Sequence, residues 1–261
     1  MQAIFDWCVV GNGPIVSKDL PLARHTIGFN KPLAAPFNAI VHNNKEIGLS
    51  KSIGLHTECG LESVLPKLID TALTLEAELG CWPSLGLTVV TTGVGLNLRL
   101  SVQRMDLLPS IARPSTLASN TPLAASFHNW LAERRYALTL LKDLDWPQYM
   151  MTLNVEPLVE FHNQSNCLNE LLSLPNASKE QAKNGIDFLY NIPLNAWVKA
   201  VLLAKDTDIV ACDSLFVLSR TSHQTVNWWL YDYTYSIKMN AIRTRLALAQ
   251  AHHYASTLFL S

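Results

Sequence analysis

Three asparagines stand where short apolar segments end, all within the first 43 residues. They are Asn12, which lies between Gly11 and Gly13, and Asn30 and Asn43, which each follow a run of strand character. Neighbouring strands of an α/β protein bring their carboxyl ends to the ligand crevice. Because an amide side chain both donates and accepts hydrogen bonds, three of them suit a sugar-phosphate better than a pyrophosphate alone. The spacing therefore predicts a sugar-phosphate site formed by the three asparagines and by the two glycines that flank Asn12.

The turn with the two glycines also resembles the first half of a dinucleotide-binding motif. In that motif, G-x-G-x-x-G, the third glycine position is occupied here by Val16. An acidic residue is expected to close the second strand, and Asn30 occupies roughly that place. A generic nucleotide turn thus stays open as an interpretation. A dinucleotide-dependent oxidoreductase is the less favoured alternative.

A second segment has the residue types of an anion site. Pro83-Ser84-Leu85-Gly86 leads into the apolar run at 87–90. Such a turn at a helix start presents backbone N–H groups and a hydroxyl, and the helix dipole favours negative charge there. We expect Ser84, Leu85 and Gly86 to contact an anionic group. The simpler alternative is that Ser84 only caps the helix.

His128 is the candidate for acid–base chemistry. The segment 127–133 places it in the predicted first turn of a helix, followed by Glu133. A helix N-terminus disfavours the imidazolium form, which leaves a neutral ring able to accept a proton near neutral pH. The alternatives are a structural histidine and a Glu133 that pairs with Arg134 or Lys142 on the surface.

In this order, the three segments resemble the sialyltransferases, which use a CMP-activated acid sugar. Val9-Val-Gly-Asn-Gly13 with Phe29-Asn30 is similar to the large motif of that family, and Pro83–Leu87 is similar to its small motif. His128 with Glu133 is similar to its very small motif. Asn43 is similar to a strand-ending asparagine of the bacterial relatives. The resemblance covers about residues 5 to 142.

The resemblance implies an inverting glycosyltransferase with a Rossmann-like, GT-A-variant fold. The donor would be a CMP-activated acid sugar, and the acceptor would be a hydroxyl of a glycan or glycolipid. No cofactor or metal is expected, because no acidic pair of the metal-binding DxD type stands at the end of a predicted strand. Asp206-Thr-Asp208 has that pattern, but it lies in the helical half of the chain. The implied roles are His128 as catalytic base, Asn12, Asn30 and Asn43 on the CMP phosphate and sugar, Ser84 and Gly86 on the phosphate or the donor carboxylate, and Leu85 and Glu133 in the same binding set.

Two features of the family are missing from this chain. No histidine between Asp106 and Phe127 matches its additional histidine motif. Cys8 is present, but Asn97 stands in the region of the cysteine that pairs with it in secretory members. Five widely spaced cysteines without a CxxC pair also indicate reduced thiols. We therefore expect a bacterial-type, cytoplasmic protein.

The composition is that of a folded globular protein. The chain has 261 residues, of which 49% are hydrophobic and 16% charged, and its formal net charge is −1. This balance argues against nucleic-acid binding, which needs a concentrated basic face. The low charge leaves room for an apolar surface, either at a homo-oligomer interface or in peripheral contact with the inner face of a membrane. Residues 79–98 lack charged side chains but contain Pro83 and four glycines, so they predict a loop and a buried helix rather than a membrane span.

Apolar periodicity places the elements that position these residues. It predicts strands at 3–10, 26–29, 38–42 and 98–102, helices at 61–79 and 127–144, and further helices near 155–174, 178–190, 194–205 and 225–258. We therefore predict an α/β, Rossmann-like catalytic domain at 1–145 and a helical C-terminal extension at 146–261. The aromatic cluster at 228–235 is predicted to pack in an interdomain core, or else to form a platform for an acceptor sugar or a membrane surface. A non-catalytic nucleotide-binding or assembly module is the alternative function.

Overall fold

The chain divides into two compact units in the computed structural model, which describes residues 4–14, 19–43, 53–58, 60–118, 121, 123–153, 167–218 and 227–259. Unit 1 comprises residues 1–107 and 139–151, and unit 2 comprises residues 108–138 and 152–261. In this division the segment 108–138 belongs with the helical residues of unit 2. The predicted domain boundary at residue 145 stays a prediction.

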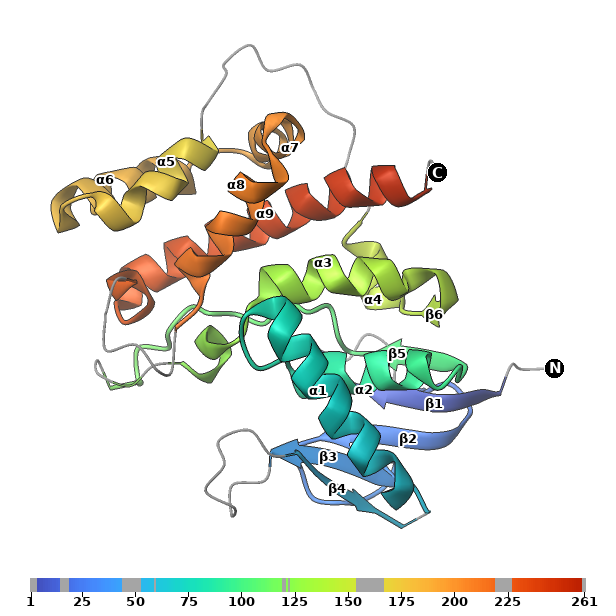
Figure 1. Cartoon of the computed structure of the whole chain (residues 1–261). Coiled ribbons are helices and arrows are strands. Elements are labelled where there is room, and N and C mark those ends of the chain that lie inside the picture. The colour runs from blue at the N-terminus through green and yellow to red at the C-terminus, as the bar shows by residue number, and fades with distance from the viewer. Residues whose placement is uncertain are drawn as a thin grey trace. The chain divides into compact units, whose positions relative to one another are not determined.

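Within the described residues, unit 1 is built around a six-stranded sheet (Figure 1). Its strands are β1 (Phe5–Val10), β2 (Ala23–Phe29), β3 (Ala39–Asn43), β4 (Ile53–Thr57), β5 (Leu100–Gln103) and β6 (Leu144–Asp145). Their order is β4-β3-β2-β1-β5-β6, and every neighbouring pair is parallel except β3 and β4. The predicted α/β class is therefore confirmed at the level of a mostly parallel sheet with helices.

The burial of the strands explains which of them could be predicted. In β1, Cys8, Val9 and Val10 are all 0% exposed. Parallel strands covered on both faces read as continuous apolar runs, and the predicted strands correspond to β1, β2, β3 and β5. The edge strand β4 was not predicted, because Gly54 weakens its strand character and His56 is exposed.

Two helices lie over the sheet of unit 1 (Figure 1). In α1 (Leu65–Leu79), apolar residues are buried at helical spacing, and Gly80 ends the helix with a φ of 70°, in the left-handed region that glycine adopts at helix C-termini. In α2 (Leu85–Gly95), most residues are buried, so the predicted loop and buried helix within 79–98 are confirmed. Among the described residues, no helix combines the length and the hydropathy needed to cross a bilayer. The remaining helical elements of unit 1 are η1 (Glu62–Val64), η3 (Leu141–Asp143) and α4 (Pro147–Met151).

Unit 2 is helical in its described residues. Its elements are η2 (Ala124–Phe127), α3 (Trp130–Leu140, which continues into unit 1), α5 (Cys167–Ser173), η4 (Leu174–Asn176), α6 (Lys179–Tyr190), α7 (Leu194–Leu203), α8 (Asp206–Ala211), η5 (Cys212–Phe216), η6 (Trp228–Leu230) and α9 (Tyr233–Phe259). The long helix α9 packs against α6 and α7 (Figure 1). Trp197 and Trp229 are fully buried in this core, and the Trp229 indole donates to the carbonyl of Leu215 at 2.9 Å.

Two helix starts differ from their prediction, and a side-chain cap explains each. Helix α3 begins at Trp130 rather than at 127, because the Asn129 side chain accepts a first-turn N–H at 3.1 Å. Helix α9 begins at Tyr233 rather than near 225, because the Asp232 side chain accepts a first-turn N–H at 3.0 Å. Apolar periodicity does not locate helix ends to within a turn, whereas a capping side chain does.

Candidate functional site

One edge of the sheet carries the sequence motifs that follow strands. Because β1 is parallel to both β2 and β5, and β2 is parallel to β3, the residues after these strands lie along the same edge. We call it the carboxyl edge. It includes the predicted site residues Gly11, Asn12 and Gly13 after β1, Asn30 after β2 and Asn43 at the end of β3.

The two glycines after β1 pack against the backbone of the turn after β5. The N–H of Gly11 donates to the carbonyl of Gln103 at 2.8 Å, and the N–H of Gly13 donates to the carbonyl of Arg104 at 3.0 Å. A Cβ atom would lie 2.4 Å from the Arg104 carbonyl oxygen on Gly11 and 2.7 Å from it on Gly13. Both positions therefore require glycine, since no side chain fits such a close backbone approach. Between them, Asn12 has an exposed side chain that is able to meet a ligand.

The N-terminus of α2 meets the same turn after β5. Ser84 accepts the N–H of Leu87 at 3.3 Å, which confirms its predicted capping role. Leu85 and Gly86 are buried in the first turn of the helix. A Cβ atom on Gly86 would lie 2.4 Å from the Sδ atom of Met105. The turn after β1 and the start of α2, far apart in sequence, thus converge on Arg104 and Met105.

Asn30 also has a structural role at the carboxyl edge. Its φ is 52°, in the left-handed region that asparagine tolerates better than most residues. Its Oδ1 atom accepts the N–H of Asn43 at 3.2 Å, and its N–H donates to the carbonyl of Val41 at 3.1 Å. Asn30 therefore ties the ends of β2 and β3 together. The side chains of Asn30 and Asn43 are exposed, so a ligand could still reach them.

Arg104 is a residue of the carboxyl edge that sequence reasoning missed. It follows β5 with a φ of 56°, and its buried Nε atom has no hydrogen-bond partner within the described residues. Burial raises the pKa of Cys8 to about 11, the Asp145 carboxylate adds to the rise, and the Arg104 guanidinium opposes it. The Cys8 thiol is therefore protonated at neutral pH, and Arg104 supplies positive charge near it. A basic residue directly after a strand was the signal that could have identified it.

His128 lies in unit 2, before α3 rather than in its first turn. Its backbone is extended, with φ −116° and ψ 141°, and Asn129 separates it from the helix start at Trp130. The predicted position inside the helix was wrong because the Asn129 cap moves the start of the helix. The His128 Nδ1 atom lies 3.8 Å from Glu133 Oε1, and the two side chains are 22% and 0% exposed. A partly accessible imidazole thus faces a fully buried carboxylate, which is suited to orienting the ring.

A buried polar network holds the start of α3 within unit 2. The carboxylate of Asp213 accepts a hydrogen bond from Asn129 at 3.1 Å and two from Arg135 at 2.9 and 2.5 Å. Arg135 also donates to Gln250 at 2.8 Å. Because Asp213 is 5% exposed, this is a buried ion pair with satisfied hydrogen bonds. The network fixes Asn129, and with it the adjacent His128.

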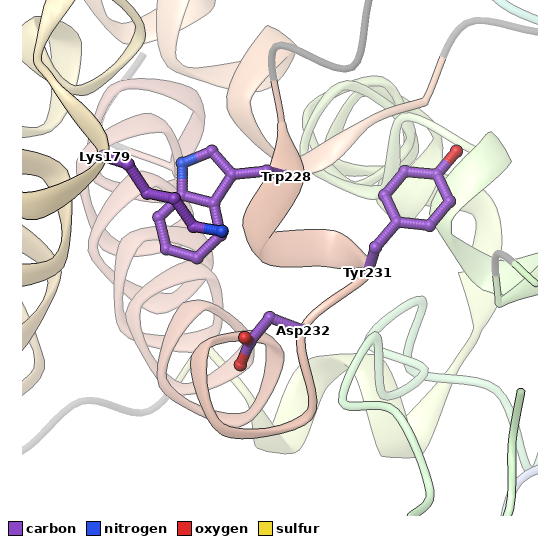
Figure 2. Close-up of a pocket in the computed structure, with 4 residues that line it drawn as sticks. All are labelled: Lys179, Trp228, Tyr231 and Asp232. Atoms are coloured by element: carbon purple, nitrogen blue, oxygen red, sulfur yellow. The ribbon is translucent and has the colours of Figure 1, made fainter. Parts of the chain in front are cut away.

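A pocket opens at the aromatic cluster of unit 2 (Figure 2). Its volume is about 310 Å³, and it is lined by Lys179, Trp228, Tyr231 and Asp232. We call it the aromatic pocket. Trp229, from the same cluster, is buried in the core of unit 2. The cluster therefore divides between core packing and an accessible surface.

The described residues contain no group of three or more histidine, cysteine, aspartate or glutamate side chains placed to hold a metal ion. Asp206 and Asp208 lie in the first turn of α8, and Asp206 accepts a hydrogen bond from the Tyr254 hydroxyl at 3.2 Å. No protein-family model matches the chain, and no curated protein and no solved structure matches it either.

Proposed function

We propose that the chain is a metal-independent, inverting glycosyltransferase that moves an acid sugar from a CMP donor to a hydroxyl of a glycan or glycolipid. CMP binds at the carboxyl edge of unit 1. His128 is the catalytic base, a role that the sequence resemblance implies. The observation that carries the proposal is the convergence of the turn after β1 and the N-terminus of α2 on Arg104 and Met105.

The strand order supports a Rossmann-like nucleotide site. With the antiparallel β4 left out, the parallel strands run β3-β2-β1-β5-β6, which corresponds to the order 3-2-1-4-5 of the dinucleotide-binding fold. In such sheets, ligands bind outside the carboxyl ends of the strands, where the strand order reverses. That reversal falls between β1 and β5, and the two loops that converge follow these two strands.

The groups at this position suit a phosphate. The helix dipole gives the first turn of α2 a partial positive charge, and Ser84, which accepts the N–H of Leu87, holds the helix start in place. The Arg104 guanidinium offers planar, charged donors of the kind that bind phosphate oxygens. CMP leaves as an anion, so fixed donors of this kind lower the barrier to its departure. The chain has no histidine between 107 and 126 that could match the additional histidine motif of the sialyltransferases. In the proposed site, Arg104 supplies the positive charge in its place.

The connection after β1 argues against a dinucleotide as the ligand. In the dinucleotide-binding fold, the glycine-rich turn opens a helix whose N-terminus holds the pyrophosphate. Residues 11–14 and 19–22, between β1 and β2, form no helix. The helix N-terminus that meets the turn after β5 comes from α2 instead.

In the proposed reaction, Glu133 positions His128. A carboxylate beside Nδ1 holds the ring proton on that atom, so that Nε2 accepts the proton of the acceptor hydroxyl as its oxygen attacks the anomeric carbon. The separation of 3.8 Å exceeds a hydrogen bond, but catalytic contacts of this kind shorten when substrate binds. Since Glu133 is fully buried, this role fits it better than the predicted direct contact with substrate, which stays a prediction.

Titration of the full chain with CMP, NAD and FAD tests the proposal. We expect CMP to raise the melting temperature, because a ligand at a hundredfold excess over its dissociation constant stabilises the native state by about 2.7 kcal/mol. NAD and FAD should leave the melting temperature unchanged, and transfer from a CMP-activated acid sugar should survive EDTA. A shift with NAD and none with CMP would overturn the proposal, and CMP binding without transfer would favour the non-catalytic module.

Two variants locate the CMP site. Asn12→Ala and Arg104→Gln should each weaken CMP binding, since both remove donors at the carboxyl edge. The matched control is Arg24→Gln, because the Arg24 side chain on β2 is 74% exposed and pairs with Asp6 at 3.5 Å. Equal CMP affinity in all three variants would place the nucleotide elsewhere.

A further inference from the structure

We propose that the aromatic pocket of unit 2 binds a neutral sugar ring, such as the terminal residue of a glycan (Figure 2). All four lining residues belong to unit 2, whereas CMP is proposed to bind residues of unit 1. The inference therefore goes beyond the proposed transferase activity and does not depend on it.

The Trp228 side chain is half-buried, so part of its ring offers apolar surface to a sugar. The Trp228 ring is held edge-on by Trp229 and Tyr235, with centroid distances of 5.8 and 5.2 Å and interplanar angles of 68°. Tyr231, directly after η6, also lines the pocket, and its ring lies on the opposite side of η6 from the Trp228 ring (Figure 2). An aromatic side chain combines a flat apolar face with a polar edge or tip, which suits the C–H face and the hydroxyls of a pyranose. A ring held by its neighbours also loses little conformational entropy on binding.

The charged groups of the pocket match a ligand that both donates and accepts hydrogen bonds. The Lys179 ammonium lies 5.0 Å from the centroid of the Trp228 ring, and the Asp232 carboxylate lines the same pocket (Figure 2). An ammonium only donates and a carboxylate only accepts. Sugar hydroxyls satisfy both groups at once.

The same charges disfavour ionic ligands. Lys179 already occupies the cation site over Trp228, so a quaternary ammonium ligand would meet both a filled site and a like charge. The Asp232 carboxylate repels phosphate. The volume of about 310 Å³ is at the lower end of ligand pockets, which span about 300 to 1,000 Å³. This size fits a monosaccharide or disaccharide.

The backbones of both charged residues are placed by helix starts. The Asp232 Oδ1 atom accepts the N–H of Tyr235 at 3.0 Å, and this bond begins α9. Lys179 is the first residue of α6 and lies within the capping box that Ser178 forms with Gln181. The backbone of each residue is therefore fixed before any ligand binds.

Direct binding to the full chain tests the inference. The probes are lactose, N-acetyllactosamine, maltose and methyl β-glucoside, with choline and inorganic phosphate as ionic controls. Tryptophan fluorescence and saturation-transfer NMR measure binding. At least one glycoside should bind, and neither ion should compete with it. Lys179→Ala and Asp232→Asn should each weaken binding about tenfold, the loss expected for one hydrogen bond to a charged group.

The variants are chosen to separate binding from folding. Asparagine caps helices as well as aspartate does, so Asp232→Asn should keep the melting temperature of the parent chain. Phe188→Ala is the matched control, because Phe188 is 54% exposed and does not line the pocket. CMP affinity should be unchanged in every one of these variants, which keeps this test distinct from that of the transferase. The inference is overturned if no glycoside binds, if choline or phosphate binds more tightly, or if Lys179→Ala and Asp232→Asn bind like Phe188→Ala.

Discussion

The carboxyl edge of unit 1 and the start of α3 in unit 2 hold their candidate residues in opposite ways. At the carboxyl edge the backbone does so, because the N–H groups of Gly11 and Gly13 donate to the turn after β5 at a distance where no Cβ atom fits. At α3 the side chains do so, because Asn129 and Arg135 converge on a buried Asp213. The first site is sensitive to added volume, and the second is sensitive to lost charge.

We call the backbone contacts of Gly11 and Gly13 the backbone scaffold, and the network around Asp213 the polar scaffold. The residues of both scaffolds differ from the residues proposed to bind or react, so the two groups can be substituted separately. Asn12 and Arg104 stand on the backbone scaffold of unit 1 without forming its close contacts through their own side chains. His128 stands next to the polar scaffold of unit 2. Substitutions of the scaffold should lower stability, whereas substitutions of the candidate functional residues should lower binding or turnover in a folded protein.

The largest expected effect is on turnover, at His128. His128→Ala removes the proposed base, and general-base catalysis contributes about a hundredfold to ten-thousandfold, so transfer from a CMP-activated acid sugar should fall by that factor. CMP affinity and melting temperature should stay unchanged. His56→Ala, at an exposed position on β4, is the control and should keep full activity. Near-normal transfer by a folded His128→Ala protein would remove this residue from the mechanism.

The largest effect on stability is expected at the polar scaffold. Asp213→Ala leaves the Arg135 guanidinium, which is only 15% exposed, without its carboxylate, and breaking a buried pair costs about 3–5 kcal/mol. Urea denaturation measures the loss. The control is Glu180→Ala, which breaks the exposed pair with Lys183 and should cost about 0–1 kcal/mol. Similar losses in the two variants would show that the network does not hold unit 2 as described.

Substitutions of three glycines by alanine in unit 1 should change the free energy of unfolding by graded amounts. Gly11→Ala forces a Cβ atom against the Arg104 carbonyl and should cost about 1–3 kcal/mol, as overpacking does. Gly86→Ala should cost less, because the clashing group is the flexible Met105 side chain. Gly95→Ala meets nothing within 4 Å and should stabilise by about 0.4–1 kcal/mol. Thermal or urea denaturation would contradict the series if Gly11→Ala were as stable as Gly95→Ala.

The smallest effect is a pH dependence that the two units should share. Burial raises the pKa of Cys8 in unit 1 to about 11 and that of Cys212 in unit 2 to about 12, from an ordinary value of 9.0. Unfolded thiols ionise first, so the free energy of unfolding is fully retained below pH 9 and falls as pH rises toward 11 and 12. Between pH 9 and 10 each thiol should account for a fall of about 1 kcal/mol.

Paired denaturation curves at these two pH values measure the thiol contribution. In the double variant Cys8→Ala with Cys212→Ala, the part of the pH dependence that comes from the two thiols should disappear. An unchanged slope in that variant would mean that neither thiol is buried in solution as it is in the structure.

The amino-acid sequence by itself determined where most elements lie and which residues follow the predicted strands. Continuous apolar runs located β1, β2, β3 and β5, and Gly80 marked the end of α1. The asparagines at 12, 30 and 43 were correctly expected at strand ends. These features could be predicted because each depends on a few consecutive residues, whose period and turn chemistry are readable along the chain.

Only the tertiary structure explained why glycine stands at some of these positions, where His128 lies relative to its helix, and which tryptophan is buried. The glycines at 11 and 13 are required by the backbone carbonyl of Arg104, and Gly86 packs against the side chain of Met105, both far from these glycines in the sequence. His128 lies outside α3 because Asn129 caps the helix, and Asn129 is held by the distant Asp213. Of two adjacent tryptophans, Trp229 is buried and Trp228 lines a pocket. Each of these outcomes depends on contacts between segments that folding brings together, and local periodicity carries no record of such contacts.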